Sequence, residues 1–548
     1  MKNILIAFAI LASSTGFAQD SIRIPDIVSA AKVIDLSYTQ KELDTMYAGV
    51  MENFENYRLM HKEHLDNSVP MSMWQNPVLP GMHFVTKQEP IDWNIPANIN
   101  LPKNKQDLAF YSILELASLI KNKKISAVEL TKFYIDRLKK FSDTLQCVIS
   151  YTENVAMEQA KQADAEIAKG KYRGPLHGIP YGLKDLFAVK GTKTTWGAAP
   201  YKDQTIDVDA YVYTRLKNAG AVLVAKFTLG ALAMGDYWFG GRTKNPWNLN
   251  NGSSGSSAGS ASATVAGLVP FAIGTETWGS ITSPSGVCGA TGLRPTFGSI
   301  SRSGAMTLSW SLDKVGPICR SAEDAALVFS AIHGTDGKDQ SAVNMPFNYK
   351  TQNSLKGKKI AYAKNYFDKI TDTSRNEWKV LEEYRKLGVE LIPINFPDSG
   401  IYNFNIMHVV ISAECAAAFD EFTRMGIDDQ MTRQGKYDWP NSFRVSRLMP
   451  AVEYVNANRH RYLLMQKVNE LMEKYDAVIC PNFGGNQSAI TNLTGHPVIV
   501  FPTGFNKTKT PTSITLVGKL YDEATIITIA KAYQQSTNWN KLHPPMFQ

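Results

Sequence analysis

The sequence predicts an α/β protein in which a β-sheet is layered between helices (α/β/α). Two observations lead to this fold class. Short apolar segments typical of buried strands alternate along the chain with longer segments whose apolar residues recur at helical spacing. The 548 residues are 44% hydrophobic and 20% charged, which is ordinary for a globular protein with a large core. Strands and helices that alternate in this way pack as layers.

The beginning of the chain, residues 19–105, is an irregular extension in front of this pattern. Helical patches are expected at 29–34 and 40–59, and a run rich in Met and Pro follows at 70–102. Two interpretations of the extension remain open at this point. It packs on the core as a lid or brace, or it is peripheral.

The regular pattern begins with three helices. The first is expected at 111–121, where apolar residues share one face. A capping box at Ser126 and Glu129 starts the second helix. The third, at 153–169, ends at Gly170, a residue type that favours helix termination.

Strands and helices then alternate to the end of the chain. A long and mostly helical stretch separates the middle strands from the last ones, and it carries no recognisable motif. The expected strands are 181–189, 221–226, 359–363, 389–394, 477–480, 498–501 and 514–517, and the expected helices are 210–217, 374–387 and 522–535.

Residues 245–296 are rich in Gly, Ser and Thr, but apolar residues interrupt them, so they are not a flexible linker. The pattern predicts a Ser/Gly loop at 251–259, a small-residue helix at 260–267, a buried strand at 269–273 and a second loop around 278–280. Successive backbone N–H groups in such loops make an anion-binding concavity. Two hydroxyl-rich loops at one strand end provide what an acyl-transfer site needs.

This stretch resembles the amidase signature family, whose members are serine hydrolases with a Ser-Ser-Lys triad. The motif G-L-V-P at 267–270 aligns the family's serine pair with Ser256 and Ser257 and its nucleophile with Ser280. The separation, 280 − 256 = 24, is that of the family pattern. The upstream motif G-I-P-x-x-x-K-D places the family's lysine at Lys184. The resemblance extends from residue 108 to near the C-terminus.

The resemblance implies a mixed central β-sheet flanked by helices, formed by one domain over residues 106–548. A variable region on the substrate side is expected at about 335–475. Residues 19–105 would precede this domain as an irregular and helical extension.

The resemblance also implies how the reacting groups are arranged. Ser280 would be the nucleophile, and the backbone N–H groups of Thr277, Trp278, Gly279 and Ser280 would form the oxyanion hole. Losing one such donor typically lowers the rate by about 10²–10³.

The proton of the nucleophile would pass through Ser256, in a cis-peptide conformation, to Lys184. Lys184 has to be neutral to accept it, and burial lowers the pKa of a lysine. Ser257 would support the arrangement through hydrogen bonds. Ser-Lys systems are established variants of the acyl-transfer triad.

Two positions depart from the family pattern. Trp278 stands where the family usually has Gly, and it would be strained if the position required a positive φ. Alternatively, Trp278 could form a wall of the acyl pocket. Thr282 stands where many relatives have an Arg that some use to pair with a substrate carboxylate, so a carboxylate-bearing substrate is disfavoured.

Other kinds of site are disfavoured. Residues 255–259 match G-x-S-x-G, but a nucleophile elbow needs a buried strand before it, and the polar residues 248–254 are not expected to form one. The nine histidines contain no H-E-x-x-H pattern, so neither a metal site nor a cofactor is expected. The net charge of +8 is small for this length, and we expect no binding to nucleic acid.

Residues 1–18 have the features of a secretory signal peptide: one Lys, a short apolar run and small residues before Gln19. We therefore expect an exported protein, periplasmic or secreted, without a membrane anchor. The five cysteines are widely spaced, which favours buried free thiols, with one disulfide as the alternative.

The sequence thus predicts an exported amidase that hydrolyses a linear carbon–nitrogen amide bond through an acyl-enzyme. Its substrate would be a small-molecule or peptide amide, and it would release ammonia or an amine. A catalytically silent binding or scaffold protein is one alternative, and an amidotransferase A-type subunit is another. The identity of the amide and the oligomeric state are not determined by the sequence.

Overall fold

An 11-stranded sheet runs through the centre of the computed structural model, which describes residues 22–34, 36–63, 77–351, 355–402 and 404–548. The strands are β1 (Val148–Tyr151), β2 (Pro180–Lys184), β3 (Val222–Phe227), β8 (Phe271–Glu276), β9 (Thr291–Arg294), β10 (Lys314–Cys319), β11 (Ile360–Ala363), β12 (Leu391–Ile394), β13 (Ala477–Pro481), β14 (Val498–Phe505) and β15 (Pro511–Gly518). Their spatial order is β1-β3-β2-β8-β10-β9-β14-β15-β13-β11-β12. The signal peptide predicted at residues 1–18 lies outside the described residues.

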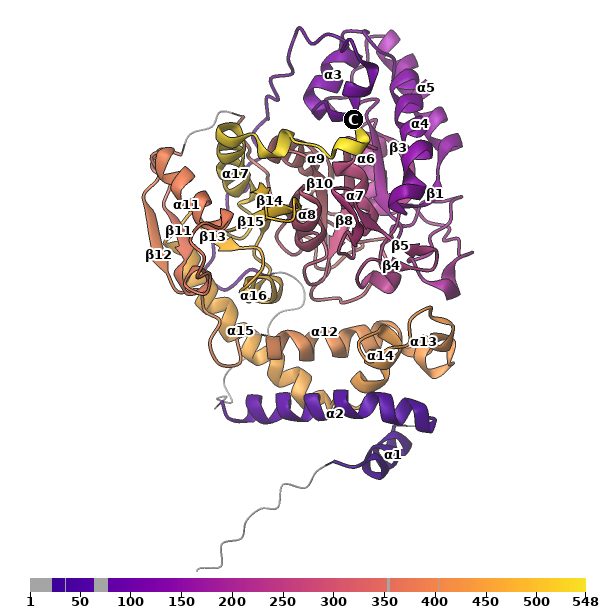
Figure 1. The fold of residues 1–548 in the computed structure, drawn as a ribbon, viewed down its shortest axis with the longest axis vertical. Helices are drawn as coiled ribbons and strands as arrows, with labels where there is room; N and C mark the ends of the chain where they lie inside the picture. The colour runs from indigo at the N-terminus through magenta and orange to yellow at the C-terminus, as the bar shows by residue number, and fades with distance from the viewer. Residues whose placement is uncertain (1–21, 35, 64–76, 352–354, 403) are drawn as a thin grey trace, which may run out of the picture.

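The sheet is mixed. Strand β2 runs parallel to β3 and β8, and β11 runs parallel to β12 and β13, whereas the remaining neighbours are antiparallel. Helices flank the sheet (Figure 1), which confirms the predicted fold class. Most of its strands are buried along their whole length, as expected for a sheet that is covered on both faces.

Most of the helices follow the predicted pattern. These are α3 (Ile113–Lys121), α4 (Ala127–Leu145), α5 (Glu153–Ala168), α6 (Tyr211–Asn218), α7 (Ala258–Val265), α11 (Asn376–Lys386) and α17 (Glu523–Thr537). Two further helices, α9 (Ala322–Ile332) and α16 (Gln487–Thr494), were not predicted. The predicted capping box at Ser126 and Glu129 is formed. Helix α3 begins two residues later than expected because Ser112 and Glu115 form a capping box as well.

Two elements of the Gly/Ser-rich stretch were not expected. Helix α8 (Thr282–Cys288) follows Ser280 directly, although it contains Pro284. Proline is tolerated in the first turn of a helix, where its missing N–H group would have no intrahelical acceptor. The polar residues after 247 form a strand, β7 (Asn248–Gly252), which pairs with β6 (Lys244–Asn245) in a separate two-stranded ribbon. Much of β7 is exposed, so it is not the buried strand that a nucleophile elbow requires.

The boundaries of two central strands also differ from the prediction. Strand β2 ends at Lys184 rather than at residue 189, because the chain turns there and the N–H of Phe187 donates back to the Lys184 carbonyl. Strand β8 extends beyond residue 273 to Glu276, which pairs with Lys314 of β10. Both differences bring polar side chains to the ends of buried strands.

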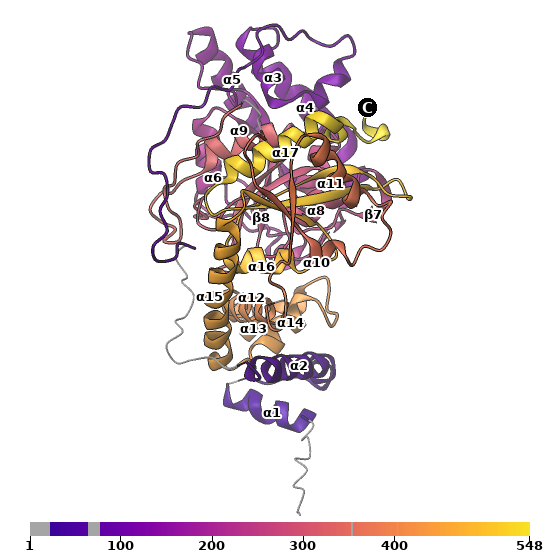
Figure 2. The same ribbon diagram turned by 90° about the vertical axis from the view of Figure 1, so that its left-hand side faces the viewer.

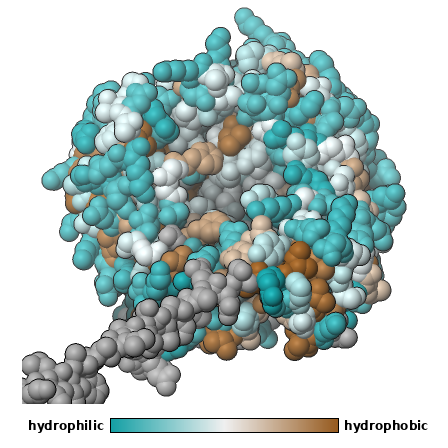
Figure 3. Space-filling model, turned by 60° about the horizontal axis from the view of Figure 1, so that its bottom comes forward, coloured by the Kyte–Doolittle hydropathy of each residue, from teal (hydrophilic) through white to brown (hydrophobic). Residues whose placement is uncertain are grey.

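A helical layer lies below the sheet in Figures 1 and 2. It contains α12 (Phe404–Ala418), α13 (Asp420–Arg424), α14 (Trp439–Ser446) and α15 (Ala451–Glu473), together with α1 (Ile24–Val33) and α2 (Gln40–His61) of the N-terminal extension. Figure 3 shows the molecule with this side brought forward, and hydrophobic residues are interspersed there among hydrophilic ones. The layer is formed by two segments that are far apart in the sequence.

The extension packs on the body of the protein and is not peripheral. Ile27, Leu43 and Met46 are buried and form a cluster with Val445 of α14. No helix in the described ranges has the length and hydropathy of a membrane span. All five cysteines are buried free thiols, as expected.

A buried ion pair fixes the end of β2. Lys226 Nζ lies 2.8 Å from Asp185 Oδ1, and both side chains are fully buried. We expect Lys226→Met to lower the free energy of unfolding by about 3–5 kcal/mol, because it leaves the Asp185 carboxylate buried without its partner. Urea unfolding of the two proteins measures the difference.

Lys139→Met is the matched control for this substitution, since it removes a lysine from an exposed ion pair with Glu153. Its unfolding midpoint should stay close to that of the unmodified protein. An equal shift in both variants would contradict a specific role of the buried pair.

Candidate active site

Lys184 lies at the end of β2 and is fully buried among hydroxyl groups. Its Nζ lies 2.8 Å from Ser256 Oγ, 3.1 Å from Ser257 Oγ and 2.9 Å from Thr275 Oγ1. The two serines come from the first Ser/Gly loop, and Thr275 comes from the neighbouring strand β8. The structure therefore brings together the lysine and the serine pair that the sequence motifs predicted to meet.

Burial of Lys184 lowers its pKa to about 7, while the more distant charges of Asp313 and Glu276 raise it slightly. The cause is desolvation, because a buried ammonium loses the stabilisation that water gives it. A substantial fraction of Lys184 is consequently a neutral amine near neutral pH. This is the state that a general base requires.

The two serine loops contact each other directly. The N–H of Ser257 donates to the carbonyl of Ser280 over 3.1 Å. The peptide bond between Gly255 and Ser256 is cis, as the family resemblance implied. Gly274 allows the first loop to pack closely on strand β8, since a Cβ at this position would lie 2.7 Å from Ser257 Oγ.

Residues 277–280 form the turn between β8 and α8 and present Ser280 toward a cavity. Among the described residues, the N–H groups of Trp278, Gly279 and Ser280 donate to no protein acceptor. Gly279 has a φ of +82°, whereas Trp278 is not among the described residues with a positive φ. The strain considered for Trp278 is therefore absent, and the N–H groups are available to an anion.

The carboxylate of Glu276 holds this turn in place. Its Oε2 accepts hydrogen bonds from the N–H groups of Ile281 and Thr282, each over 2.9 Å. Its Oε1 accepts from Arg294 and from Asn492, each over 2.8 Å. The first turn of α8 is therefore capped from inside the core by a side chain of the preceding strand.

Burial alone would raise the pKa of Glu276, but the Arg294 charge and the hydrogen bonds that the carboxylate accepts lower it to about 2. Glu276 is therefore ionised at neutral pH although both it and Arg294 are fully buried. A carboxylate in such a position depends on its cationic partner.

A cavity of about 390 Å³ lies next to Ser280. Its walls are mostly apolar and aromatic, and the ring of Trp278 lies 5.1 Å from that of Phe404. The lining comes from the serine loops, the segments 233–235 and 404–446, helix α2, and Leu308. The residues are Gly49, Glu52, Ala233, Met234, Gly235, Gly255, Thr277, Trp278, Ser280, Leu308, Phe404, His408, Ile411, Ser412, Lys436, Tyr437, Trp439, Asn441, Ser442, Val445 and Ser446.

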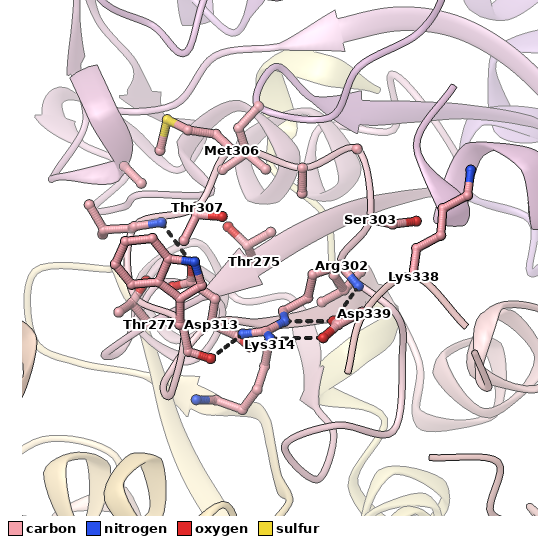
Figure 4. Close-up of a pocket in the computed structure, with 17 residues that line it drawn as sticks. Thr275, Thr277, Arg302, Ser303, Met306, Thr307, Asp313, Lys314, Lys338 and Asp339 are labelled. Carbon is pink, nitrogen blue, oxygen red and sulfur yellow. Dashed lines mark hydrogen bonds and ion pairs between the residues drawn. The ribbon is translucent and has the colours of Figure 1, made fainter. Parts of the chain in front are cut away.

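A second, smaller cavity of about 240 Å³ adjoins the first and shares Ala233, Thr277 and Leu308 with it (Figure 4). Its polar lining includes Thr275 and Asp313, and Thr277 Oγ1 donates to Asp313 Oδ1 over 2.6 Å. The Thr277 side chain is thus held by Asp313, and Thr277 lines both cavities.

Several residues that organise this site were not predicted from the sequence. Thr275 contacts Lys184, Asp313 contacts Thr277, and Glu276 holds the residues after the turn. Arg294 in turn pairs with Glu276, and this pairing could not be identified from the sequence. Thr282 does not face the cavity, because its hydroxyl donates to Glu276.

His177 lies away from this site, and no metal-binding cluster is found among the described residues. In the part of the chain that the structure describes, no group of three or more His, Cys, Asp or Glu side chains could hold a metal ion. His177 precedes β2, at the opposite end of the strand from Lys184, and it is fully buried beside Glu166. It is not among the residues that line the cavity at Ser280.

The Amidase family model matches residues 129–487 of this chain. The A-type subunit of glutamyl-tRNA(Gln) amidotransferase from Coxiella burnetii is 34% identical over 481 residues, with 79% of this chain and 99% of that protein covered. The peptide amidase of Stenotrophomonas maltophilia is similar in structure, with a TM-score of 0.70 and 27% identity over 81% of this chain and 100% of that one. For the corresponding amidotransferase subunit of Thermotoga maritima, the TM-score is 0.67 with 25% identity, covering 80% of this chain and 98% of that one.

The lowered pKa of Lys184 predicts how the reactivity of Ser280 depends on pH. We expect the rate of Ser280 modification by a fluorophosphonate to fall about tenfold per pH unit below about pH 7 and to level off above it, because only the neutral amine accepts a proton. Labelling rates measured across this range give the profile. A rate that is independent of pH in the unmodified protein would contradict Lys184 as the base.

Substitution of Glu276 tests the support of the turn. We expect Glu276→Gln to lower the free energy of unfolding by about 3–5 kcal/mol, because the Arg294 guanidinium remains buried without a counter-charge. Denaturant unfolding measures this loss. Fluorophosphonate labelling of the folded fraction measures any change in the reactivity of Ser280. Glu153→Gln, which changes an exposed pair, is the control and should alter neither.

Proposed function

The chain belongs to the amidase family, and we propose that it cleaves the carbon–nitrogen bond of a linear amide through an acyl-enzyme on Ser280. The observation that carries this proposal is the buried Lys184, whose lowered pKa and 2.8 Å contact with Ser256 suit a base for a serine nucleophile. Ser280 itself borders a mostly apolar cavity in which an acyl group can be bound.

In the first half of the reaction, Ser280 Oγ attacks the carbonyl carbon of the amide, and its proton passes through Ser256 to Lys184. The carbonyl oxygen becomes an oxyanion, to which the free N–H groups of the 277–280 turn donate. Collapse of this intermediate breaks the carbon–nitrogen bond. The leaving nitrogen takes the proton from Lys184 through Ser256 and departs as ammonia or an amine.

In the second half, water attacks the ester carbon of the acyl-enzyme. Its proton passes through Ser256 to Lys184. Collapse of this second intermediate breaks the ester bond, releases a carboxylic acid, and returns the proton from Lys184 through Ser256 to the Ser280 oxygen. The sum is one amide and one water converted to one acid and one amine. Lys184 ends in its starting state, as a catalyst must.

An amidotransferase A-type subunit is the second candidate. Its support is the 34% identity to such a protein over nearly all of that protein's length. In this case the ammonia released from the amide would be passed to a second reaction in partner subunits, whereas a free-standing amidase would act alone. Thr282, which stands where many members of the family have an Arg, favours the free-standing enzyme.

A strained backbone at Trp278 would have favoured a catalytically silent protein, and Trp278 has no positive φ. Export through a signal peptide at residues 1–18 remains part of the proposal, with a periplasmic or secreted location. Mass-spectrometric determination of the mature N-terminus tests it. A terminus at Gln19 would support export, and an intact N-terminus would contradict it.

The proposed roles predict the effects of single substitutions. We expect Ser280→Ala and Lys184→Ala each to lower kcat for an amide substrate about 10⁴-fold or more, because each removes a group that takes part in proton or acyl transfer. Ser257→Ala should lower it only about tenfold, since this hydroxyl supports Lys184 without reacting. Turnover of a panel of primary amides, with ammonia release as the readout, measures these changes.

The same panel separates the two candidates. Hydrolysis of simple amides by the purified chain alone supports a free-standing amidase. Activity on glutamine that appears only with co-purified subunits supports the amidotransferase role. Equal turnover by the unmodified protein and Ser280→Ala would exclude both.

A further inference from the structure

We propose that helix α2 of the N-terminal extension forms the outer wall of the acyl subsite and selects the substrate. Gly49 would set the width of the subsite, and Glu52 would favour amides whose apolar acyl chain ends in a cationic group. The inference rests on Ser280 as the nucleophile of the proposed reaction. Helix α2 lies outside the segment that the family model matches, which begins at residue 129.

Helix α2 is held against the cavity by contacts of several kinds. Glu42 Oε1 lies 3.0 Å from Arg444 Nη2 of α14. Asn53 is buried, and its Oδ1 lies 3.1 Å from His408 Nε2 of α12. The helix is therefore anchored on both sides of the point at which it reaches the cavity.

Gly49 lies at the point of closest approach. A Cβ added there would lie 3.1 Å from Cγ2 of Val445, and both residues border the cavity. Because glycine has no side chain, the backbone of α2 itself forms this part of the wall. The side chain of any larger residue at position 49 would lie beside Val445, in the part of the cavity that we propose holds the acyl group.

The cavity is lined by one acidic side chain, Glu52, and by two basic side chains, His408 and Lys436. Burial lowers the pKa of His408, partly offset by the charge of Glu52, so the imidazole is neutral at neutral pH. Lys436 is exposed and lies over the Tyr437 ring, with its Nζ 5.1 Å from the ring centroid.

Glu52 is exposed at the mouth of the cavity. Within the ranges that the structure covers, its carboxylate makes no ion pair and no hydrogen bond, in contrast to Glu55 on the same helix, which pairs with Arg58 at 3.2 Å. A free carboxylate at the mouth of an apolar cavity attracts a cation at the far end of a bound acyl chain. It repels a carboxylate in the same place.

The experiment uses two series of alkyl fluorophosphonates of increasing chain length, one neutral and one with a terminal ammonium. Labelling rates of Ser280 are measured for the full chain and for two pairs of variants. Gly49→Leu is compared with Ala48→Leu, and Glu52→Gln with Glu55→Gln. Ala48 and Glu55 lie on the same helix but do not border the cavity.

We expect Gly49→Leu to slow labelling by the longer probes about tenfold or more while the shortest probe is little affected, because the added side chain fills the subsite. Glu52→Gln should reduce the preference for ammonium over neutral probes about threefold, which is the scale of an exposed charge interaction. Both control variants should retain the preferences of the unmodified protein.

The possible results separate a failure of the proposed α2 subsite from a failure of the proposed reaction at Ser280. Labelling of Ser280 with unchanged length and charge preferences in both test variants would overturn the role of α2 and leave the proposed reaction intact. A matching change in the control variants would also overturn it, because the effect would then come from general damage to the helix. No adduct on Ser280 in the unmodified protein would overturn the nucleophile and, with it, this subsite.

Discussion

The buried ion pair between Glu276 and Arg294 is the interaction on which the site depends. Glu276 ends the strand that follows the first serine loop, and its carboxylate caps the helix that follows Ser280. Arg294 lies on β9 and also donates to the carbonyl of His496 over 2.7 Å. The ion pair thus joins strands β8 and β9 to helix α8 through the carboxylate, and to the segment after α16 through the guanidinium.

The arrangement explains why the turn can leave N–H groups free. A helix start normally satisfies its first N–H groups with a capping side chain or with water. Here Glu276 satisfies those of Ile281 and Thr282, so the turn before them is fixed without using its own donors. The charge that does this is stable in the core only because Arg294 accompanies it.

The chemistry and the selection of substrate are assigned to different parts of the molecule. The triad and the turn are built on the central sheet, where the strands are buried and rigid. The far wall of the cavity is built from the helical layer, which combines the segment 404–446 with helix α2. Such a division allows the wall to change while the reacting groups stay in place.

The sequence predicted the fold class, most of the strands and helices, and the residues that meet at Lys184. Those predictions rest on local patterns, namely apolar periodicity, capping boxes and a motif of fixed spacing. It did not predict the pairing of Glu276 with Arg294 or the place of Glu52 at the cavity. Both depend on contacts between residues that are distant in the chain, and the pairing of buried charges leaves no periodic pattern. The helix α8 was missed because Pro284 and its small neighbours have low helix propensity, which the Glu276 cap overrides.

The hydrogen bonds around Lys184 also indicate why Ser256, and not Ser257, can transfer the proton. Ser257 Oγ donates its hydrogen to the carbonyl of Thr275 over 3.1 Å and accepts one from the Thr275 N–H over 3.2 Å. It can therefore only accept from Lys184. A neutral amine has two hydrogens and one lone pair, so two of its hydroxyl neighbours accept and one has to donate. If Thr275 Oγ1, 2.9 Å from Nζ, is the second acceptor, then Ser256 at 2.8 Å is the hydroxyl that donates its hydrogen to the lone pair of neutral Lys184, which is the direction that proton transfer from Ser280 requires.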